Sequence, residues 1–364
     1  EEDLTIVDNI SENTTWETGK VYQLGGRIAV LDGVTLTIEP GVIIKGEAGT
    51  GSNATALLVA RGATLIAEGT ADSPIIFTSV ADEIVPGEVA SPNLDPTLNG
   101  LWGGVIVLGN ATISADAASV QIEGIPASDQ NGLYGGDDDA DNSGSIKYVS
   151  IRHGGANIGE GNEINGLTLG GVGSGTTIEN VEIVSNQDDG IEWFGGAVSV
   201  SNVVVWNTGD DAIDTDQAWS GTLNNFVILN PGDECFELDG GEGNFNNMHT
   251  ITNGSVSAQD AEGLADLDDK GPAGTVGNSY VDMSNIYFFD VTYGQDFDDN
   301  PADLTAAGFE LTVPSETLEV SDFFVDGVAD AVTIVAAGAN TIGADMSKFT
   351  GWSWAAVSGA LDGF

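Results

Sequence analysis

The sequence predicts an all-β solenoid, a fold in which the chain winds into successive coils and each coil is one repeat. Three observations support this prediction. A cassette of strand-forming residues recurs at intervals of 22 and 23 residues, apolar and polar residues alternate between glycines and prolines, and acidic residues follow each cassette in register. A period of this length is typical of solenoids, in which each coil packs against its neighbours.

The cassettes and the acidic steps that follow them lie between residues 178 and 237. The cassettes read Ile178–Ile183, Val200–Val205 and Leu223–Ile228. The acidic steps read Asp188–Glu192, Asp210–Asp214 and Asp233–Glu237. Aligning the coils on the apolar residue of each step stacks the acids in three columns. The columns are Asp188, Asp210 and Asp233; Asp189, Asp211 and Glu234; and Glu192, Asp214 and Glu237.

The chain before and after this array follows the same design with interruptions. Residues 4–80 alternate between apolar and polar side chains and break at glycine or proline, as short strands do. We expect loop insertions near 81–100, 124–145 and 256–280, which carry proline, glycine and acidic runs. The predicted organisation is therefore a β-helix over residues 1–305 and C-terminal coils with a capping tail over 306–364. The aromatic-rich residues 340–364 are expected to cover the last coil, because an open solenoid end needs a cover.

Asparagine recurs at two positions of the repeat. The first series is Asn180, Asn202, Asn225, Asn247 and Asn285. The second series is Asn186, Asn207, Asn230 and Asn253. Amide side chains at equivalent positions can hydrogen-bond along a stack, so both series predict structural ladders at bends of the coil.

The charge balance excludes some partners and favours others. The 364 residues include 57 acids and 8 bases, which gives a net charge of −49. Nucleic acids and anionic membrane surfaces are unsuitable partners for such a chain, whereas divalent cations suit it. The same composition fits a saline habitat, where salt screens repulsion between acids. No apolar run approaches the length of a membrane-spanning helix, so membrane insertion is not expected, and Glu1–Asp3 reads as a processed N-terminus.

Four segments carry a resemblance to a known family. They are Leu36–Ile44, Gly62–Ala71, Pro74–Ser79 and Leu101–Asn110. These segments resemble secreted bacterial right-handed parallel β-helix proteins of the pectin-lyase architecture, and the resemblance extends over about residues 1–300. It implies three parallel sheets wound into a prism and a secreted or surface location. That family contains lyases, hydrolases and adhesins, so the resemblance constrains activity only weakly.

The acid columns favour calcium. Parallel coils lie about 4.8 Å apart, and two carboxylates at that spacing repel by about 3.5 kcal/mol at an effective dielectric constant near 20. Either retained protons or bound cations must offset this repulsion. Calcium accepts six to eight oxygen ligands at flexible distances. Asp139 and Asp141 begin a further calcium-loop-like run, although Ser150 stands where a full loop of this type would need glutamate.

An enzyme is the alternative interpretation. The step at Asp210 and Asp211 resembles the paired aspartates of polygalacturonases, in which carboxyl groups act as general acid and base. The Gly-His-Gly and Arg-x-Lys steps of that family are absent from the sequence, and the acidic step recurs as a structural repeat does. The sequence therefore favours a structural or adhesive protein, secreted or at the cell surface, that is stabilised by calcium. We expect it to contact glycans or other copies of itself, in filaments or a surface layer. Polysaccharide cleavage by Asp210 and Asp211 is the runner-up.

Overall fold

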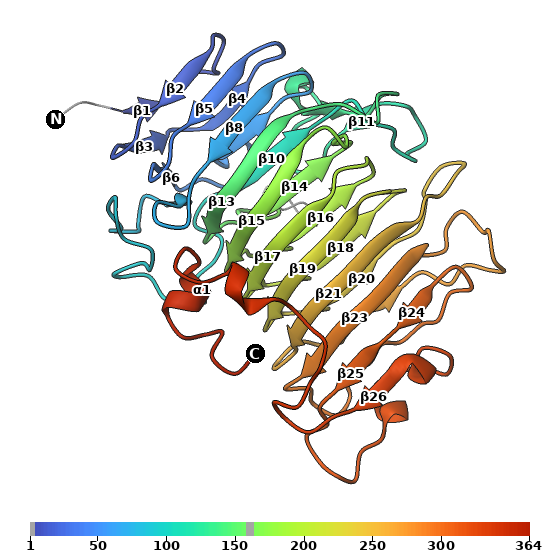
Figure 1. Ribbon diagram of the computed structural model, residues 1–364. Helices are drawn as coiled ribbons and strands as arrows, with labels where there is room; N and C mark the ends of the chain where they lie inside the picture. Colours follow the sequence, from blue (N-terminus) through green and yellow to red (C-terminus); the bar gives the residue numbers. More distant parts are fainter. Residues whose placement is uncertain (1–3, 158–163) are drawn as a thin grey trace.

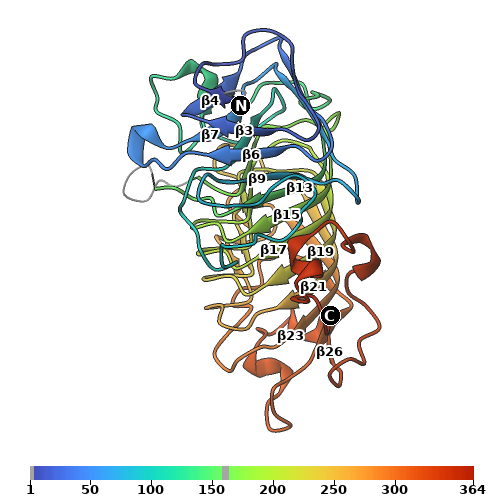
Figure 2. The same cartoon turned by 90° about the vertical axis from the view of Figure 1, so that its left-hand side faces the viewer.

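The computed structural model describes residues 4–157 and 164–364, so the expected processed N-terminus at Glu1–Asp3 lies outside the described residues. The chain forms a right-handed parallel β-helix (Figure 1). Its coils stack into a long rod, and the termini of the described chain lie far apart along it (Figure 2). The prediction of an all-β solenoid is confirmed.

Two parallel sheets account for nearly all described strands. The main ladder of sheet A contains β1 (Thr5–Ile6), β3 (Val21–Leu24), β6 (Ile43–Gly46), β9 (Ile75–Ser79), β13 (Gly144–Arg152), β15 (Thr177–Val184), β17 (Val200–Trp206), β19 (Thr222–Leu229), β21 (His249–Ser257), β23 (Val281–Phe289), β25 (Phe309–Leu311) and β26 (Val332–Ile334). Four further strands join sheet A beside this ladder: β2 (Thr14–Trp16), β5 (Thr35–Ile38), β8 (Thr64–Glu68) and β24 (Thr305–Ala307). Sheet B contains β4 (Arg27–Val30), β7 (Ala56–Val59), β10 (Val105–Leu108), β14 (Leu167–Gly170), β16 (Ile191–Phe194), β18 (Ile213–Asp216), β20 (Phe236–Leu238) and β22 (Asp266–Leu267).

The remaining elements are short. Strands β11 (Val120–Gln121) and β12 (Leu133–Tyr134) form an antiparallel pair. The helical turns are η1 (Gly51–Asn53), η2 (Gln130–Gly132), η3 (Val320–Asp322), η4 (Ala329–Ala331), η5 (Met346–Lys348) and α1 (Trp354–Val357). Over the described residues, no helix has the length and apolar character needed to cross a bilayer.

Sheet A corresponds to two of the three sheets of the prism, because each of its long strands bends and continues from one sheet into the next. Strand β8 pairs with the first half of β13 and β9 pairs with its second half, so one strand continues both. Tyr148 lies between the halves with a φ of 50°, a left-handed conformation that turns the strand. Asparagine tolerates this conformation better than most residues because its short side chain bonds locally. The five later strands of this kind bend at Asn180, Asn202, Asn225, Asn253 and Asn285, with φ values of 56–61°.

The pairing of strands confirms most of the first asparagine series and corrects one member. Residue Thr252 pairs with Asn224 and Gly254 pairs with Phe226, so Asn253 and not Asn247 stands opposite Asn225. Along the bend, Asn225 Nδ2 donates to Asn202 Oδ1 at 2.8 Å. A second ladder joins Asn230 Nδ2 to Asn207 Oδ1 at 3.0 Å, as expected for that pair. The predicted second series is wrong at Asn253, which belongs to the first. It is also wrong at Asn186, because Ser185 stands opposite Asn207.

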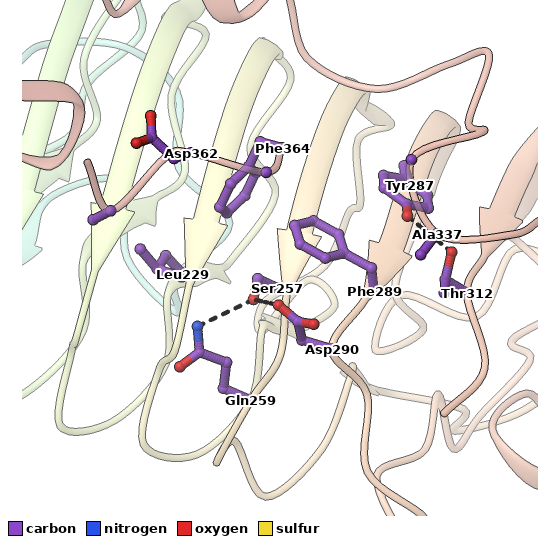
Figure 3. Close-up of a pocket in the computed structure, with 13 residues that line it drawn as sticks. Leu229, Ser257, Gln259, Tyr287, Phe289, Asp290, Thr312, Ala337, Asp362 and Phe364 are labelled. Carbon is purple, nitrogen blue, oxygen red and sulfur yellow. Dashed lines mark hydrogen bonds between the residues drawn. The ribbon is translucent and has the colours of Figure 1, made fainter. Parts of the chain in front are cut away.

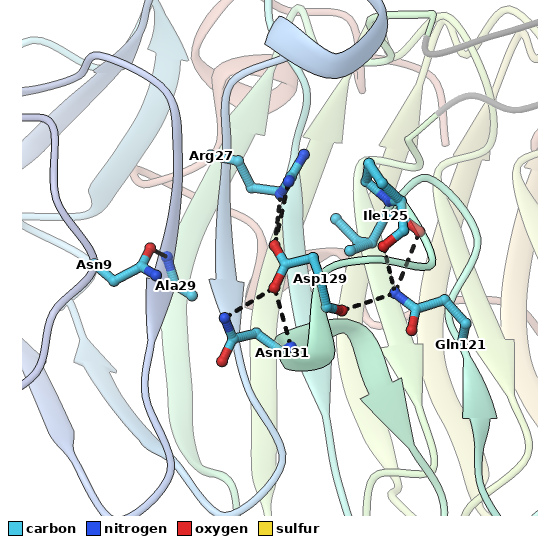
Figure 4. A network of polar contacts seen from close by, with 8 residues as sticks. Asn9, Arg27, Ala29, Gln121, Ile125, Asp129 and Asn131 are labelled. Atoms are coloured by element: carbon cyan, nitrogen blue, oxygen red, sulfur yellow. Dashed lines mark hydrogen bonds and ion pairs between the residues drawn. The ribbon is translucent and has the colours of Figure 1, made fainter.

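The insertions agree with the prediction in part. Residues 81–100 form a loop outside the strands, as expected. The second insertion begins earlier than predicted and folds over the outer face of sheet B. There Ile113, Ile122 and Ile125 join one apolar cluster with residues of β4, β7 and β10. An ion pair between Arg27 and Asp129, at 3.2 Å, ties this insertion to β4, and Gln121 bonds to backbone oxygens within it (Figure 4). The third insertion differs, because β22 continues the coil inside 256–280 and the bulges lie at residues 239–248 and 268–280.

The C-terminal segment packs against the side of the solenoid. Residues 344–364 cross the outer face of β15, β17 and β19 (Figure 1). Their Phe349, Trp352 and Trp354 join one apolar cluster with the sheet. The end of the rod is closed by earlier residues of the 306–364 region, with Phe323 and Phe324 buried against the main core. The covering role predicted for residues 340–364 thus falls to η3, η4 and the chain around them.

Candidate metal-binding face

The outer face of sheet B is divided into two halves. The second insertion covers the N-terminal half, and its Tyr134 packs against Phe194 of β16. Beyond Phe194 the strands β16, β18, β20 and β22 carry acids outward, while their alternate residues point into the core. We call this half the acidic face and define it by the carboxylates described below.

One column of the acidic face follows directly from strand register. Glu192 pairs with Asp214, and Asp214 pairs with Glu237, as the sequence predicts. The same register adds Thr168 above this column and Asp266 below it. The column therefore extends over more coils than the repeat alone revealed.

A second column connects the turns that precede these strands. The backbone N–H of Asp211 donates to Asp189 Oδ1 at 3.0 Å, and the backbone N–H of Glu234 donates to Asp211 Oδ1 at 2.7 Å. Each carboxylate thus accepts an amide of the next coil. Asn165 stands one coil above Asp189, because the N–H of Gly166 donates to the carbonyl of Asp189. This column joins the coils structurally as well as carrying charge.

Carboxylates of neighbouring coils come close enough to share a cation. One oxygen from each member of a group of three lies within 4.8 Å of the others. Three such groups contain predicted residues: Asp188, Asp189 and Asp210; Asp189, Glu192 and Asp214; and Asp210, Asp211 and Asp233. The structure therefore brings together seven of the nine predicted column residues in these groups, while Glu234 and Glu237 adjoin them in the columns.

Further acids on this face were not predicted as site residues. Asp216 follows Asp214 by two positions on the same strand and so shares its face. Asp216 begins a further column, which Asp239 and Asp268 continue on the next two coils. Lys270 forms an ion pair with Asp268. A fourth group, Asp266, Asp298 and Asp299, lies toward the C-terminal end. The alternation of strand residues would have identified Asp216. Asp298 and Asp299 lie outside the regular repeat, so only the structure places them on this face.

Burial and mutual repulsion raise the pKa values of these acids. Loss of solvent is the larger cause for Asp189, Glu192 and Asp214, whose pKa values lie well above the usual range, and neighbouring carboxylates add to it. The same causes raise the pKa of Asp216 to about 7 and that of Glu234 to about 8. Groups that resist ionisation in this way are those that a bound cation would stabilise as carboxylates.

The predicted loop at Asp139 and Asp141 has a different environment. Asp141 accepts hydrogen bonds from the backbone and side chain of Asn110, both at 3.1 Å. Asp139 Oδ1 accepts the backbone N–H of Thr112 at 2.9 Å. These two carboxylates hold the insertion to residues 110–112, and neither belongs to the groups of three possible ligands found among the described residues.

The aspartate pair of the enzyme alternative lies on the acidic face. Asp211 is 3% exposed, and its Oδ1 accepts the structural hydrogen bond from the backbone N–H of Glu234. Asp210 is half-buried. Burial first, and then a contact with Glu237, raises the pKa of Asp211 to about 10. A cavity of about 360 Å³ lies elsewhere, between sheet A and the C-terminal segment (Figure 3). Tyr287 and Phe289 stack in its wall at 4.9 Å, with Gln259 and Asp290 beside them.

Parallel coils stacked into sheets define a parallel β-helix protein, here with carboxylates stacked on one outer face. The family model of the pectate-lyase-like β-helix domain matches residues 8–356, and the chain belongs to this family. Many members of the family are polysaccharide enzymes. Comparison with curated proteins and with solved structures found no match.

Proposed function

We propose that this protein is a structural or adhesive β-helix of the bacterial exterior, secreted or displayed at the cell surface, and that calcium bound on the acidic face stabilises it. The observation that supports this proposal most strongly is the close approach of carboxylates from successive coils, within 4.8 Å in each group. Among the ion pairs of the described residues, only that of Lys270 reaches this face. Repulsion among these closely spaced carboxylates favours uptake of positive charge from solution.

Calcium fits these groups by charge and by geometry. The carboxylates of one group come from different coils, so a single ion would connect neighbouring coils. Calcium–oxygen distances of about 2.3–2.6 Å allow oxygens on opposite sides of the ion to lie about 5 Å apart. Magnesium demands shorter distances and near-octahedral order, which suits a flexible array of side chains less well.

Thermal unfolding with and without calcium tests the proposal. At a calcium concentration 100 times the dissociation constant, each site adds about 2.7 kcal/mol to the free energy of unfolding. We expect metal-free protein to melt at a lower temperature than protein in calcium chloride, with magnesium chloride at equal ionic strength recovering less. Equal melting temperatures in all three solutions would contradict the proposal.

The cavity beneath the C-terminal segment supports an adhesive contact with glycans. Its lining combines an aromatic pair with exposed Gln259, Asp290 and Asp362, and such a mixture of apolar wall and few polar groups is typical of small-ligand sites. A glycan array probed with the wild-type protein and with Gln259→Ala tests this part. Loss of a glycan signal in the variant is expected, and unchanged binding would place the contact elsewhere.

A polysaccharide-active enzyme is the second candidate, and the Asp210–Asp211 step favours it. A carboxyl group with a raised pKa beside a more exposed carboxylate is the arrangement that general acid–base catalysis uses. Activity on polysaccharides that is lost in Asp210→Asn would support this candidate. Other copies of the chain remain proposed partners, and sedimentation at several protein concentrations tests that association.

A further inference from the structure

Asn165 is a buried polar residue with an unused oxygen at the upper end of the acidic face. It is 3% exposed and lies two residues before the start of β14 at Leu167. Its Nδ2 contacts Glu192 Oε2, while its Oδ1 has no hydrogen-bond partner among the described residues. Buried side-chain oxygens are nearly always satisfied, so an orphaned one calls for a partner beyond the described residues.

The surroundings of Asn165 indicate the kind of partner. The amide lies against Glu192, and Glu192 belongs to the group in which Asp189 and Asp214 also offer oxygens within 4.8 Å. Turning the amide by 180° exchanges its two ends and sets Oδ1 against the carboxylate of Glu192. Two acceptor oxygens in contact are stable only with a proton or a cation between them.

We propose that Asn165, Asp189, Glu192 and Asp214 form the tightest cation site of the acidic face, with Asn165 as its neutral ligand. This inference rests on the cation binding proposed above and specifies where the strongest binding occurs. Amide and carboxylate oxygens are the donors that calcium takes in proteins. The ligands come from three successive coils, those of β14, β16 and β18, so one ion fastens three coils together.

Burial separates this site from the other acidic groups. Asp189 and Glu192 are each 6% exposed, and Thr168 above Glu192 is buried as well. In the group of Asp266, Asp298 and Asp299, two members are exposed. A dehydrated site strengthens the attraction between ligand and ion, whereas solvent and salt weaken it at exposed acids. The site at Asn165 is therefore expected to fill first.

Calorimetric titration of the full chain with calcium chloride tests the assignment. The wild type is expected to show one tight site followed by weaker ones. Asn165→Ala should weaken the tight site by at least about tenfold, since even a residue that only supports a ligand costs about that much. Asp266→Asn, on the same face but in the exposed group, should leave the tight site unchanged.

A third variant separates loss of a ligand from loss of packing. Asn165→Asp keeps an oxygen at the same position and should retain tight calcium binding, although its added charge lowers the stability of metal-free protein. An equal dissociation constant in the wild type and Asn165→Ala, or no tight site in Asn165→Asp, would overturn the assignment and leave general cation binding intact. A wild type that takes up no calcium would overturn both this assignment and the cation binding on which it rests.

Discussion

The carboxylate of Glu182 accepts a 3.0 Å hydrogen bond from the backbone N–H of Trp354, which lies 172 residues later in the chain. Glu182 also accepts the N–H of Ala355 at 2.8 Å and the hydroxyl of Ser150 at 2.6 Å. Its charge faces the guanidinium of Arg152, at 3.8 Å, and both side chains are fully buried. One acid on β15 therefore fixes the C-terminal segment to the side of the solenoid.

Replacing this acid should destabilise the protein strongly. Glu182→Gln removes the charge that compensates Arg152 and leaves a buried guanidinium unpaired, which typically costs about 3–5 kcal/mol. Denaturant unfolding measures the change. Glu179→Gln is the matched control on the same strand, because its ion pair with Lys147 is partly exposed and such pairs contribute about 0–1 kcal/mol. Similar losses in the two variants would contradict a special role for Glu182.

Removing the C-terminal segment should expose an apolar stripe on sheet A. Residues 344–364 cover Val204, Trp206, Val227 and Leu229, all of which are buried in the apolar cluster beneath them. A chain ending at residue 343 is expected to keep its β-sheet circular dichroism, bind more of a hydrophobic dye and self-associate. Dye binding equal to that of the full chain would show that the segment does not cover this surface in solution.

The bend asparagines should be replaceable by glycine more readily than by alanine. Asn225 has a φ of 60°, and its Oδ1 accepts the N–H of Asp345 at 2.5 Å. Asn225→Gly loses hydrogen bonds, while Asn225→Ala loses the same bonds and adds about 1–2 kcal/mol of left-handed strain. We expect the free energy of unfolding to follow the order wild type, glycine variant, alanine variant. An alanine variant as stable as the glycine variant would refute the strain at this bend.

The repeat revealed the fold and much of the acidic face because both depend on local period. Coil register follows from the spacing of apolar residues, so Glu192, Asp214 and Glu237 could be stacked without a structure. The prediction failed where the coil length changes. The insertion at residues 239–248 moves the bend to Asn253, and Gly254 stands where the ring of Phe226 on the previous coil fills the core.

Contacts between distant segments could not be predicted from the repeat. The orphaned oxygen of Asn165 is visible only once Glu192 lies beside it. The docking of Trp354 on Glu182 likewise depends on the path of the C-terminal segment, which no period describes. The sequence therefore indicates which residues share a column, while side-chain partners across coils decide which of them form a specific site.

The pH dependence of stability should reveal the strained carboxyl groups of metal-free protein. Burial and neighbouring acids raise the pKa of Asp216 from 3.8 to about 7, of Asp239 from 3.8 to about 7, and of Glu234 from 4.5 to about 8. At a pH between the unfolded and the folded pKa of each group, the folded chain holds a proton that the unfolded chain releases. Stability is therefore complete below about pH 4 for these groups and falls as the pH rises toward 8.

Buried His249 works in the opposite direction, because burial lowers its pKa to about 3 from 6.5. Its contribution to the free energy of unfolding grows as the pH rises toward the unfolded pKa of 6.5. Above pH 7 that contribution is nearly constant, so the carboxyl groups determine the pH dependence there. Melting curves of resin-treated, metal-free protein from pH 7 to 8.5 should therefore show a falling transition temperature. Calcium should flatten this slope because it binds the ionised carboxylates. The double variant Asp216→Asn and Glu234→Gln should make the slope shallower without calcium but not abolish it, because Asp239 and Asp211 still hold protons in the folded chain. A slope in that variant equal to the wild type would assign the effect to other groups.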